Sequence, residues 1–590
     1  MKIIKTVAAL SIVAFSFCSL TTVAADINQL DTNTQEQLRQ QERLRLLRQQ
    51  QELKPDARLS SQQLNNTIAP VAIDRIPENE TPCFQIDEIT LIGDSADQFK
   101  SQLSAVINKT PILGRCLGAV GINAVMTQVQ NAIIAKGFVT TRVLAAPQDL
   151  KTGVLALTVI PGRVSNIRFT PDSSLRVSAW NALPISNGDM LNLRNIEQGL
   201  ENFLRVPTAE ADIQIEPAAS DHAAPGLSDL VVRYQQRFPI RLSINLDDSG
   251  SKTTGQYQGG LTLSADNLLA LNDLFYVNYN HDLGGGGEAG KRGNDGYTLN
   301  YSLPFDNWLF STNTSANDFY QTVAGTNQSY VFSGRSQTAE LKLGRLLFRN
   351  SMNKTFASLK GFLRKSNNYI DDTEIEIQKR RTAGWEFGLN QSWYFGHSIL
   401  DYNLAYRRGT GAQDALAAPE ENFGEGTSRM KLLIADLNLS LPFQLKAPWG
   451  EQPLQYSAYL RGQTNYTPLT PQDRFSIGNR FTVRGFDGEQ ILVADSGLLI
   501  RNELNVPIVH VGQTMYWGLD YGEVGGQSSK NLIGKYLAGT AIGLRGSARP
   551  MGVRILGGLS YDIFLAKPIN KPDGFVTKKM SAGFNLNYTY

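Results

Sequence analysis

Residues 433–441 read LIADLNLSL, with leucine or alanine at every odd position and mostly polar residues at the even ones. Successive side chains of a β-strand point to opposite faces, so this alternation predicts a strand with one apolar and one polar face. The same pattern recurs in YTLNYSL at 297–303 and in AGFNLNYTY at 582–590. From about residue 237 onward, the pattern therefore predicts strands rather than helices.

A soluble sandwich and a membrane barrel both contain alternating strands. Here many predicted strands look long, aromatic residues cluster near their ends, and small polar residues occupy one face, which is typical of an outer-membrane barrel. The segment 237–590 holds 590 − 236 = 354 residues. A spanning strand takes about 9–11 residues, and about as many again for turns and loops gives roughly 16 to 18 strands, enough for an aqueous channel. We predict a transmembrane antiparallel β-barrel, with 16 as the expected number of strands.

The N-terminal segment 1–25 has the pattern of a secretory signal. A short basic head precedes an apolar stretch over 7–17, and Val-Ala-Ala at 23–25 supplies the small residues of a cleavage site, so Asp26 is the expected mature start. A membrane anchor is the alternative, although the apolar run is short for a spanning helix. Cys18 would allow a lipoprotein, but the residues before it form a poor lipidation motif.

The composition bears on the class of partner. Charged residues make up 19% of the chain, and the formal net charge of +2 becomes 2 − 2 = 0 when the two lysines of the signal are removed. Nothing in this balance suggests nucleic-acid binding. No later segment holds the run of about 20 apolar residues that a membrane helix needs. No nucleotide-binding loop is apparent, and we expect no cofactor, no metal ion and no catalytic residue.

Residues 34–53 read TQEQLRQQERLRLLRQQQEL and are rich in strong helix formers, and Pro55 ends the predicted helix. Such a helix is a rod of about 30 Å, close to the hydrocarbon thickness of a bilayer. Its few leucines give only a thin apolar stripe, so it would not bury well in an ordinary core. From the residues alone, a solvated helix and a plug inside a polar pore remain equally open.

A mixed α/β pattern occurs twice between residues 82 and 236. Each copy has the order β-α-α-β-β. The first copy predicts strands at 84–92, 139–145 and 153–160, and helices at 98–107 and 121–136. The second copy predicts strands at 163–169, 211–216 and 228–235, and helices at 175–182 and 193–204.

Two cysteines remain after the signal, Cys83 and Cys116, and both lie in the first α/β copy. An exported chain folds in an oxidising compartment, where two cysteines in one small region are expected to pair. Two free thiols are the alternative. We predict a disulfide that joins Cys83 to Cys116.

Two stretches of the barrel region resemble a known superfamily. Residues 475–486, FSIGNRFTVRGF, resemble the signature of the Omp85 superfamily, in which a long extracellular loop carrying VRG(Y/F) folds back into the barrel. Residues 517–522, WGLDYG, resemble the lumen-facing strand motif of the same superfamily.

Alternation gives the WGLDYG stretch a physical meaning. The apolar side chains of that strand must meet lipid, so Asp520 points into the lumen. Arginine offers a rigid fork that matches a carboxylate bidentately, and the glycine after Arg484 would allow a tight loop backbone. We predict a loop lock that consists of Val483, Arg484, Gly485, Phe486 and Asp520, and a lumen network that adds Arg501 and Glu503. The alternative is that Asp520 is one solvated lumen charge among many.

The N-terminal half narrows the resemblance to the two-partner secretion transporters, the haemolysin activator/filamentous haemagglutinin exporter family. Four stretches resemble the first POTRA domain of that family, namely CF at 83–84, GRCLG at 114–118, VTTRV at 139–143 and PQD at 147–149. Four others resemble its first barrel hairpin, namely DDSG at 247–250, TG at 254–255, DNL at 266–268 and DL at 273–274. The Gln/Arg-rich segment resembles the plug helix of the family.

The resemblance covers nearly the whole mature chain. It implies a signal peptide at 1–25, a plug helix at 26–54, a linker at 55–81, POTRA domain 1 at 82–161, POTRA domain 2 at 162–236 and a barrel at 237–590. It also implies an outer-membrane translocator of a Gram-negative bacterium that recognises one large exoprotein through periplasmic POTRA domains, by strand addition, and secretes it through the barrel without ATP. Haemolysins, adhesins and contact-dependent inhibition toxins are the cargo types of that family.

The same resemblance sets the expected partners. We expect a secreted exoprotein with an N-terminal secretion domain, outer-membrane lipid and lipopolysaccharide, and the barrel assembly machinery during insertion. We expect no nucleic acid, and we expect a monomer.

Three alternatives belong to other functional classes. The nearest is an outer-membrane protein assembly factor of the same superfamily, although such proteins usually carry more POTRA repeats and lack the Gln/Arg helix. A general porin would need no periplasmic receptor. An outer-membrane enzyme is disfavoured because no histidine has a recognisable nucleophile context. The four histidines are His222, His281, His397 and His510.

Deleting residues 34–53 tests the predicted plug. If this segment occupies the pore at rest, its removal should raise the single-channel conductance, because a solid obstruction leaves the channel. The measurement is conductance in planar bilayers, and an unchanged conductance would exclude the plug.

Overall fold

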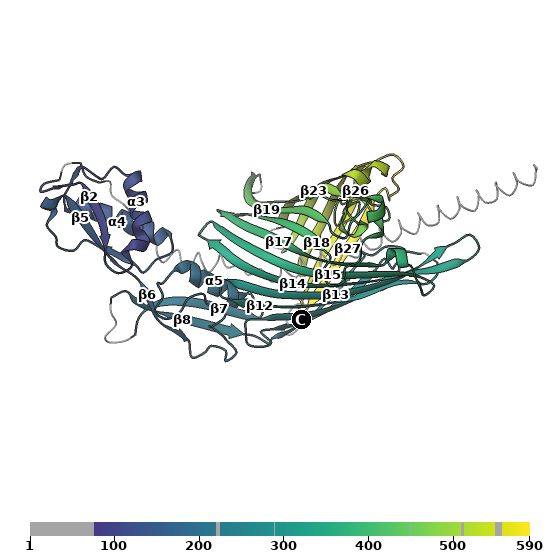
Figure 1. Ribbon diagram of the computed structural model, residues 1–590, viewed down its shortest axis with the longest axis horizontal. Helices are drawn as coiled ribbons and strands as arrows, with labels where there is room; N and C mark the ends of the chain where they lie inside the picture. The colour runs from purple at the N-terminus through teal and green to yellow at the C-terminus, as the bar shows by residue number, and fades with distance from the viewer. Residues whose placement is uncertain are drawn as a thin grey trace, which may run out of the picture.

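The computed structural model describes residues 76–78, 80–219, 225–287, 289–448, 450–508, 512–548 and 557–590. The predicted signal peptide, plug helix and most of the linker lie outside the described residues. Two small α/β units lie at one end of the molecule and are followed by a large barrel (Figure 1). Among the helices of the described ranges, none combines the length and the hydropathy that crossing a membrane requires.

The first unit contains two small sheets and two helices. Its elements are β1 (Phe84–Ile86), β2 (Glu88–Ile92), α3 (Lys100–Lys109), β3 (Arg115–Leu117), α4 (Ala119–Ala135), β4 (Arg142–Leu144) and β5 (Val154–Ile160). β1 pairs with β3, and β2 lies parallel to β5, which pairs with β4. Apolar side chains from these elements fill one core, in which Ile86, Val125 and Leu155 are fully buried.

The predicted single strand at 84–92 is two strands, because the chain changes sheets at Asp87. The backbone N–H groups of Asp87 and Glu88 both donate to the carbonyl of Gly153, at 2.8 and 3.1 Å. The chain therefore leaves the β1–β3 pair and enters the sheet of β5 within one residue. A disulfide joins Cys83, just before β1, to Cys116 in the middle of β3, so the predicted pairing is confirmed.

The second unit has one sheet in the order β6-β8-β7 and one helix. Its elements are β6 (Arg163–Phe169), α5 (Leu193–Leu204), β7 (Ala209–Pro217) and β8 (Leu227–Gln236). The predicted helix at 175–182 is wrong, since this described segment forms only turns. Three of its carbonyls, those of Arg176, Ser178 and Asn181, accept hydrogen bonds from turns of the barrel rather than from a following turn of helix. Asn272 Nδ2 donates to the Ser178 carbonyl at 2.8 Å, and the Asp306 N–H donates to the Asn181 carbonyl at 2.9 Å.

Sixteen long antiparallel strands of the described residues close into a barrel, which confirms the predicted number. They are β9 (Ile240–Asp247), β10 (Gln258–Asp266), β11 (Leu274–Asp282), β12 (Arg292–Phe305), β13 (Trp308–Ala324), β14 (Ser329–Arg349), β15 (Asn353–Ile370), β17 (Arg380–Phe395), β18 (Ser398–Thr410), β19 (Lys431–Ala447), β20 (Gly450–Asn465), β23 (Ser496–Ile508), β24 (Gln513–Gly525), β25 (Tyr536–Ala548), β26 (Gly558–Asn570) and β27 (Ser581–Thr589). The short β16 (Thr373–Glu374) only extends the hairpin after β15. In the loop between β20 and β23, β21 (Phe475–Ile477) pairs with β22 (Leu492–Ala494).

The barrel presents apolar side chains outward and polar ones inward. Along β24, Met515, Trp517 and Leu519 are 45%, 55% and 42% exposed, whereas the intervening Gly518 and Asp520 are buried. Exposing apolar side chains to water costs about 25 cal/mol per Å², but lipid tails accommodate them. The alternation therefore fits a strand that crosses a membrane with Asp520 on its lumen side.

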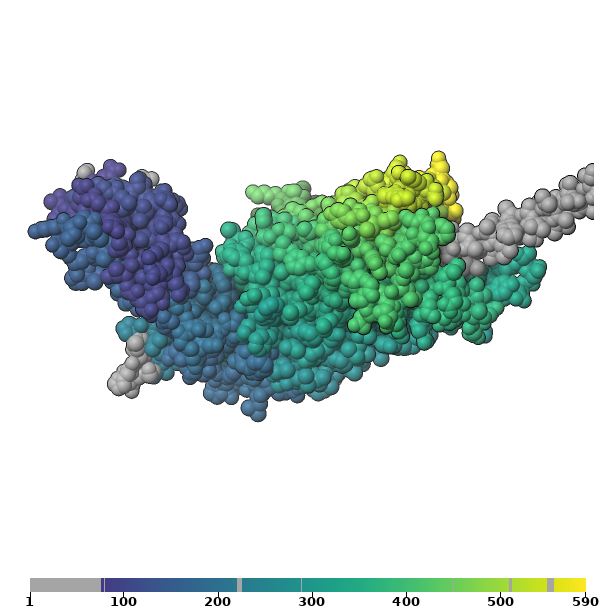
Figure 2. Space-filling model, viewed as in Figure 1, coloured from purple at the N-terminus to yellow at the C-terminus, as the bar shows by residue number. Residues whose placement is uncertain are grey.

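The second unit packs directly against turns of the barrel, and the two form one continuous surface (Figure 2). Arg349, at the end of β14, lies 2.6 Å from Glu201 and 3.2 Å from Glu197 of α5. Lys354 of β15 also pairs with Glu201. Burial raises the pKa of Glu201, but the charges of Lys354 and Arg349 outweigh it and hold the pKa at about 2. Charge pairs therefore fix the second unit at the barrel.

Replacing Glu201 with glutamine should loosen this contact by roughly 3 kcal/mol, because it takes a carboxylate from partly buried cations. Hydrogen exchange of residues 193–204 at pH 7, followed by mass spectrometry, should be faster in Glu201→Gln than in the wild type. Glu210→Gln alters an exposed glutamate of the same unit and serves as the matched control.

The size of this difference should depend on pH. Because the folded pKa of Glu201 is depressed from 4.5 to about 2, its contribution is complete above pH 4.5 and is lost as the pH falls toward 2. The wild type and Glu201→Gln should therefore converge in acid, after correction for intrinsic exchange rates. Equal exchange of the two proteins at pH 7 would contradict the role given to Glu201.

Candidate functional site

The loop between β20 and β23, residues 466–495, folds back into the barrel and is called here the re-entrant loop. Its own side chains Ile477, Val483 and Leu492 are fully buried, or nearly so, in a cluster with Leu499 of β23 and Val524 of β24. This cluster removes apolar surface from the lumen water and so stabilises the inward position of the loop.

Glycines of the barrel wall make room for the loop. A Cβ on Gly522 of β24 would lie 2.8 Å from the side chain of Ile477. A Cβ on Gly518 would overlap the guanidinium of Arg484, and one on Gly539 of β25 would overlap the Arg484 carbonyl. The two glycines of the WGLDYG stretch are therefore explained by the close approach of the loop.

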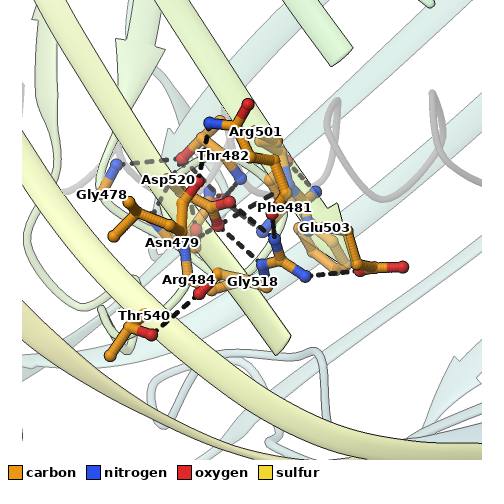
Figure 3. A network of polar contacts seen from close by, with 12 residues as sticks. Gly478, Asn479, Phe481, Thr482, Arg484, Arg501, Glu503, Gly518, Asp520 and Thr540 are labelled. Carbon is orange, nitrogen blue, oxygen red and sulfur yellow. Dashed lines mark hydrogen bonds and ion pairs between the residues drawn. The ribbon is translucent and has the colours of Figure 1, made fainter. Parts of the chain in front are cut away.

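Arg484 and Asp520 make a three-point contact inside the barrel (Figure 3). Arg484 Nε donates to Oδ2 of Asp520 at 2.7 Å, Nη2 donates to Oδ1 at 2.6 Å, and the backbone N–H donates to Oδ2 at 2.9 Å. Only 4% of Arg484 and 1% of Asp520 is exposed. Bidentate arginine–carboxylate bonds are strong, and separating such a buried pair leaves an uncompensated charge. This contact is the core of the site and is called here the lock.

Charged residues of β23 and β25 surround the lock. Glu503 accepts a bond from Arg484 Nη1 at 2.7 Å and another from Arg545 at 2.6 Å. Arg501 donates to the carbonyl of Phe481 at 2.9 Å, and its Nε lies 3.8 Å from the lock carboxylate. The loop is therefore held through its backbone as well as through the Arg484 side chain.

A tight turn precedes the VRGF motif. Thr482 Oγ1 accepts hydrogen bonds from the N–H groups of Gly478 and Asn479, at 3.0 and 3.2 Å. Asn479 Oδ1 in turn accepts from the N–H of Phe481 at 3.0 Å. These local bonds replace water as partners for the turn backbone and set the direction in which the motif leaves the turn.

Gly485 allows the chain to bend after the lock arginine. Its φ of +107° lies in the left-handed region, where a side chain is strained. A Cβ at this position would also lie 2.5 Å from the backbone carbonyl of Lys567 on β26. Both conformation and space therefore require glycine here. The next residue, Phe486, packs edge to face against Phe575, with ring centroids 5.6 Å apart.

The structure places all the residues predicted for the lock and the lumen network in one cluster. These are Val483, Arg484, Gly485, Phe486, Arg501, Glu503 and Asp520. The disulfide pair lies apart from them, in the first unit. Sequence reasoning missed Thr482, Gly539 and Arg545. The Asn479 to Thr482 spacing was a usable turn signal, but no local pattern showed that β25 borders the lock.

The arrangement can hold and release a loop. The contacts are hydrogen bonds, charge pairs and apolar packing, so the loop can leave without breaking the barrel wall. Over the part of the chain that the structure describes, no group of three or more histidine, cysteine, aspartate or glutamate side chains is placed to hold a metal ion.

Comparisons with known proteins agree with this architecture. The family described as haemolysin secretion/activation protein ShlB/FhaC/HecB matches residues 226–546, a ShlB-type POTRA domain matches residues 84–162, and a further POTRA domain matches residues 163–217. The outer membrane transporter CdiB-2 of Burkholderia pseudomallei (strain 1026b) is 37% identical over 86% of this chain and 86% of its own length. The outer membrane transporter CdiB of Dickeya dadantii (strain 3937) is 28% identical over 98% of both chains.

A solved structure gives the same result. CdiB from Acinetobacter baumannii is 29% identical and superposes with a TM-score of 0.75 over 92% of this chain and 98% of its own. The family match alone covers the barrel from β9 into β25, including the whole re-entrant loop. The chain therefore belongs to the haemolysin secretion/activation protein family, the outer-membrane transporters of two-partner secretion.

Proposed function

We propose that this protein secretes one large partner exoprotein, of the haemolysin, adhesin or contact-dependent inhibition toxin type, without ATP. As a member of its family it is an outer-membrane transporter with periplasmic POTRA domains. The observation that carries the proposal is a wide barrel whose interior holds a loop fastened only by non-covalent contacts, with POTRA domain 2 fixed at one end.

The POTRA domains offer free strand edges to an unfolded partner. In the described residues, β7 is the outer strand of POTRA domain 2 and pairs only with β8. Its nine residues present a row of backbone N–H and C=O groups on the other side. An incoming strand can pair with such an edge with little demand on its sequence. We therefore assign the first recognition of the exoprotein to edges of this kind.

Passage through the barrel requires the re-entrant loop to move. A barrel of 16 strands is wide enough for an aqueous channel, and the loop fills part of it. Engagement of the exoprotein would replace loop contacts by its own, and folding of the exoprotein outside the cell would draw the rest of the chain through. The predicted plug at 26–54 adds a second obstruction in this proposal.

The remaining partners belong to the same proposal. The exposed apolar band of the barrel would contact lipid and lipopolysaccharide, the barrel assembly machinery would insert it, and the protein would act as a monomer. The exoprotein would carry an N-terminal secretion domain that the POTRA domains recognise.

Secretion is favoured over the alternative of an outer-membrane protein assembly factor. The relatives at 37% and 28% identity are both named outer membrane transporters. Their names also favour transport over the enzyme alternative.

Replacing Arg484 with alanine should reduce export of the partner exoprotein at least about tenfold, because it removes both side-chain hydrogen bonds to the buried Asp520 and unseats the loop. The measurement is an immunoblot of the culture medium. The barrel should still show heat-modifiable migration, because its wall hydrogen bonds are intact. Normal export by Arg484→Ala would contradict the lock.

Gly518→Ala is a second way to disturb the lock without removing a charge. Its Cβ would overlap the Arg484 guanidinium, so export should fall, as it should in Arg484→Ala. Gly462→Ala is the matched control, since a Cβ there, on another barrel strand, meets nothing within 4 Å. Equal export by the two glycine variants would contradict the close fit of Arg484 against β24.

A further inference from the structure

The barrel closes where its last strand, β27, meets its first, β9. This seam has five residue pairs, from Asn585–Asp247 to Thr589–Ser243, whereas β27 makes nine with β26 and β9 makes eight with β10. β27 begins at Ser581, so its first residues extend beyond the paired region. The end of the seam away from the POTRA domains therefore has fewer backbone partners.

Side chains complete the seam at Phe584. Leu242 and Tyr590 exchange both backbone hydrogen bonds at the other end of the seam, at 3.3 and 2.9 Å. In an antiparallel ladder, every second residue pair exchanges two backbone hydrogen bonds in this way. Counted from Leu242–Tyr590, the pair Phe584–Asp248 falls on such a position and would be expected to do the same. Instead, the Asp248 carboxylate accepts the Phe584 N–H at 2.9 Å, while Arg480 pairs with that carboxylate and donates to the Phe584 carbonyl at 3.3 Å. Two side chains thus take the place of one backbone pair.

Packing supports Arg480 in this position. Its guanidinium carbon lies 4.8 Å from the ring centroid of Phe564 on β26. Gly583 leaves that ring room, since a Cβ there would overlap it. The side chains of Arg480 and Asp248 are only 18% and 10% exposed. A charge pair this sheltered, over an aromatic face, is less weakened by salt than a surface pair.

The re-entrant loop also contacts the loops on both sides of the seam. On the β9 side, Glu489 accepts the N–H of Lys252 at 3.1 Å. On the β27 side, Asp487 accepts the N–H of Lys578 at 3.1 Å. The loop therefore spans the seam, with Arg480 at the point where the two strands part.

We propose that Arg480 and Asp248 form a clasp between the re-entrant loop and the seam, so that the inward position of the loop and closure of this end of the barrel depend on each other. Arg480 is a positioning residue that acts through Asp248 and Phe584. A partner that displaces the loop also withdraws the side-chain pairing from the seam, and the clasp re-forms when the loop returns. The inference rests on the loop movement of the proposed function.

Hydrogen exchange of the full-length protein in detergent micelles, with no exoprotein present, tests the clasp. Peptides covering residues 581–590 should exchange about tenfold faster in Arg480→Ala. The variant loses hydrogen bonds to a charged group that hold this end of β27 closed, so local opening becomes more frequent. Arg480→Lys keeps the charge beside Asp248 and should restore most of the protection. Asp248→Asn keeps the acceptor shape and should give a smaller increase than Arg480→Ala.

Arg474→Ala is the matched control, because this arginine of the same loop also makes an ion pair, with Asp495 at 3.6 Å, and donates to the carbonyls of Leu469 and Glu425, all away from the seam. It should leave residues 581–590 unchanged. The clasp is overturned if Arg480→Ala and Arg474→Ala give equal exchange there, or if Arg480→Ala raises exchange equally in β13 and β14. The dependence of seam closure on loop position is overturned if Arg484→Ala releases the re-entrant loop but leaves the amides of β27 protected from exchange. This experiment does not measure export, so failure of the secretion assay would not decide whether the clasp exists.

Discussion

An arginine enclosed in a barrel needs a carboxylate, and much of the structure around the loop follows from that need. Asp520 supplies the partner from the wall at 2.6 Å. Gly518 supplies the space for the guanidinium, and Gly485 supplies the bend that lets the backbone turn away. Each of these residues would be hard to explain alone. Together they describe one buried charge pair and the room that it requires.

Arginine–carboxylate pairs recur where separate parts of the chain are joined. Arg349 holds POTRA domain 2 to the barrel turns, Arg484 holds the loop to the wall, and Arg480 holds the loop to the seam. Apolar packing, by contrast, dominates within each α/β unit, and exposed apolar side chains cover the outer face of the barrel. Such pairs are directional and can separate and re-form, which suits the movement of the re-entrant loop that the proposed function requires.

The architecture was largely predictable from local patterns, and the joints were not. Alternation and length predicted a barrel of roughly 16 to 18 strands, of which the structure has 16, and the cysteine count was enough for the disulfide. The strand at 84–92 was mispredicted because one residue, Asp87, turns the chain between two sheets. The helix at 175–182 was mispredicted because several of its carbonyls bond to barrel turns far away in the sequence. Gly539 and Arg480 were missed for the same reason, since their contacts are distant in the sequence: Gly539 lies against Arg484 of the re-entrant loop, and Arg480 contacts Asp248 and Phe584 at the seam.

A double-mutant cycle on Arg484 and Asp520 tests the lock most directly. The quantity is the opening free energy of residues 475–494, obtained from hydrogen exchange of the wild type, the two alanine variants and the double variant. If the two side chains act as one buried pair, the coupling energy should be at least about 1.5 kcal/mol, and the double variant should be little worse than either single one. Additive losses, within about 0.5 kcal/mol, would show that Arg484 and Asp520 act independently and would contradict the lock.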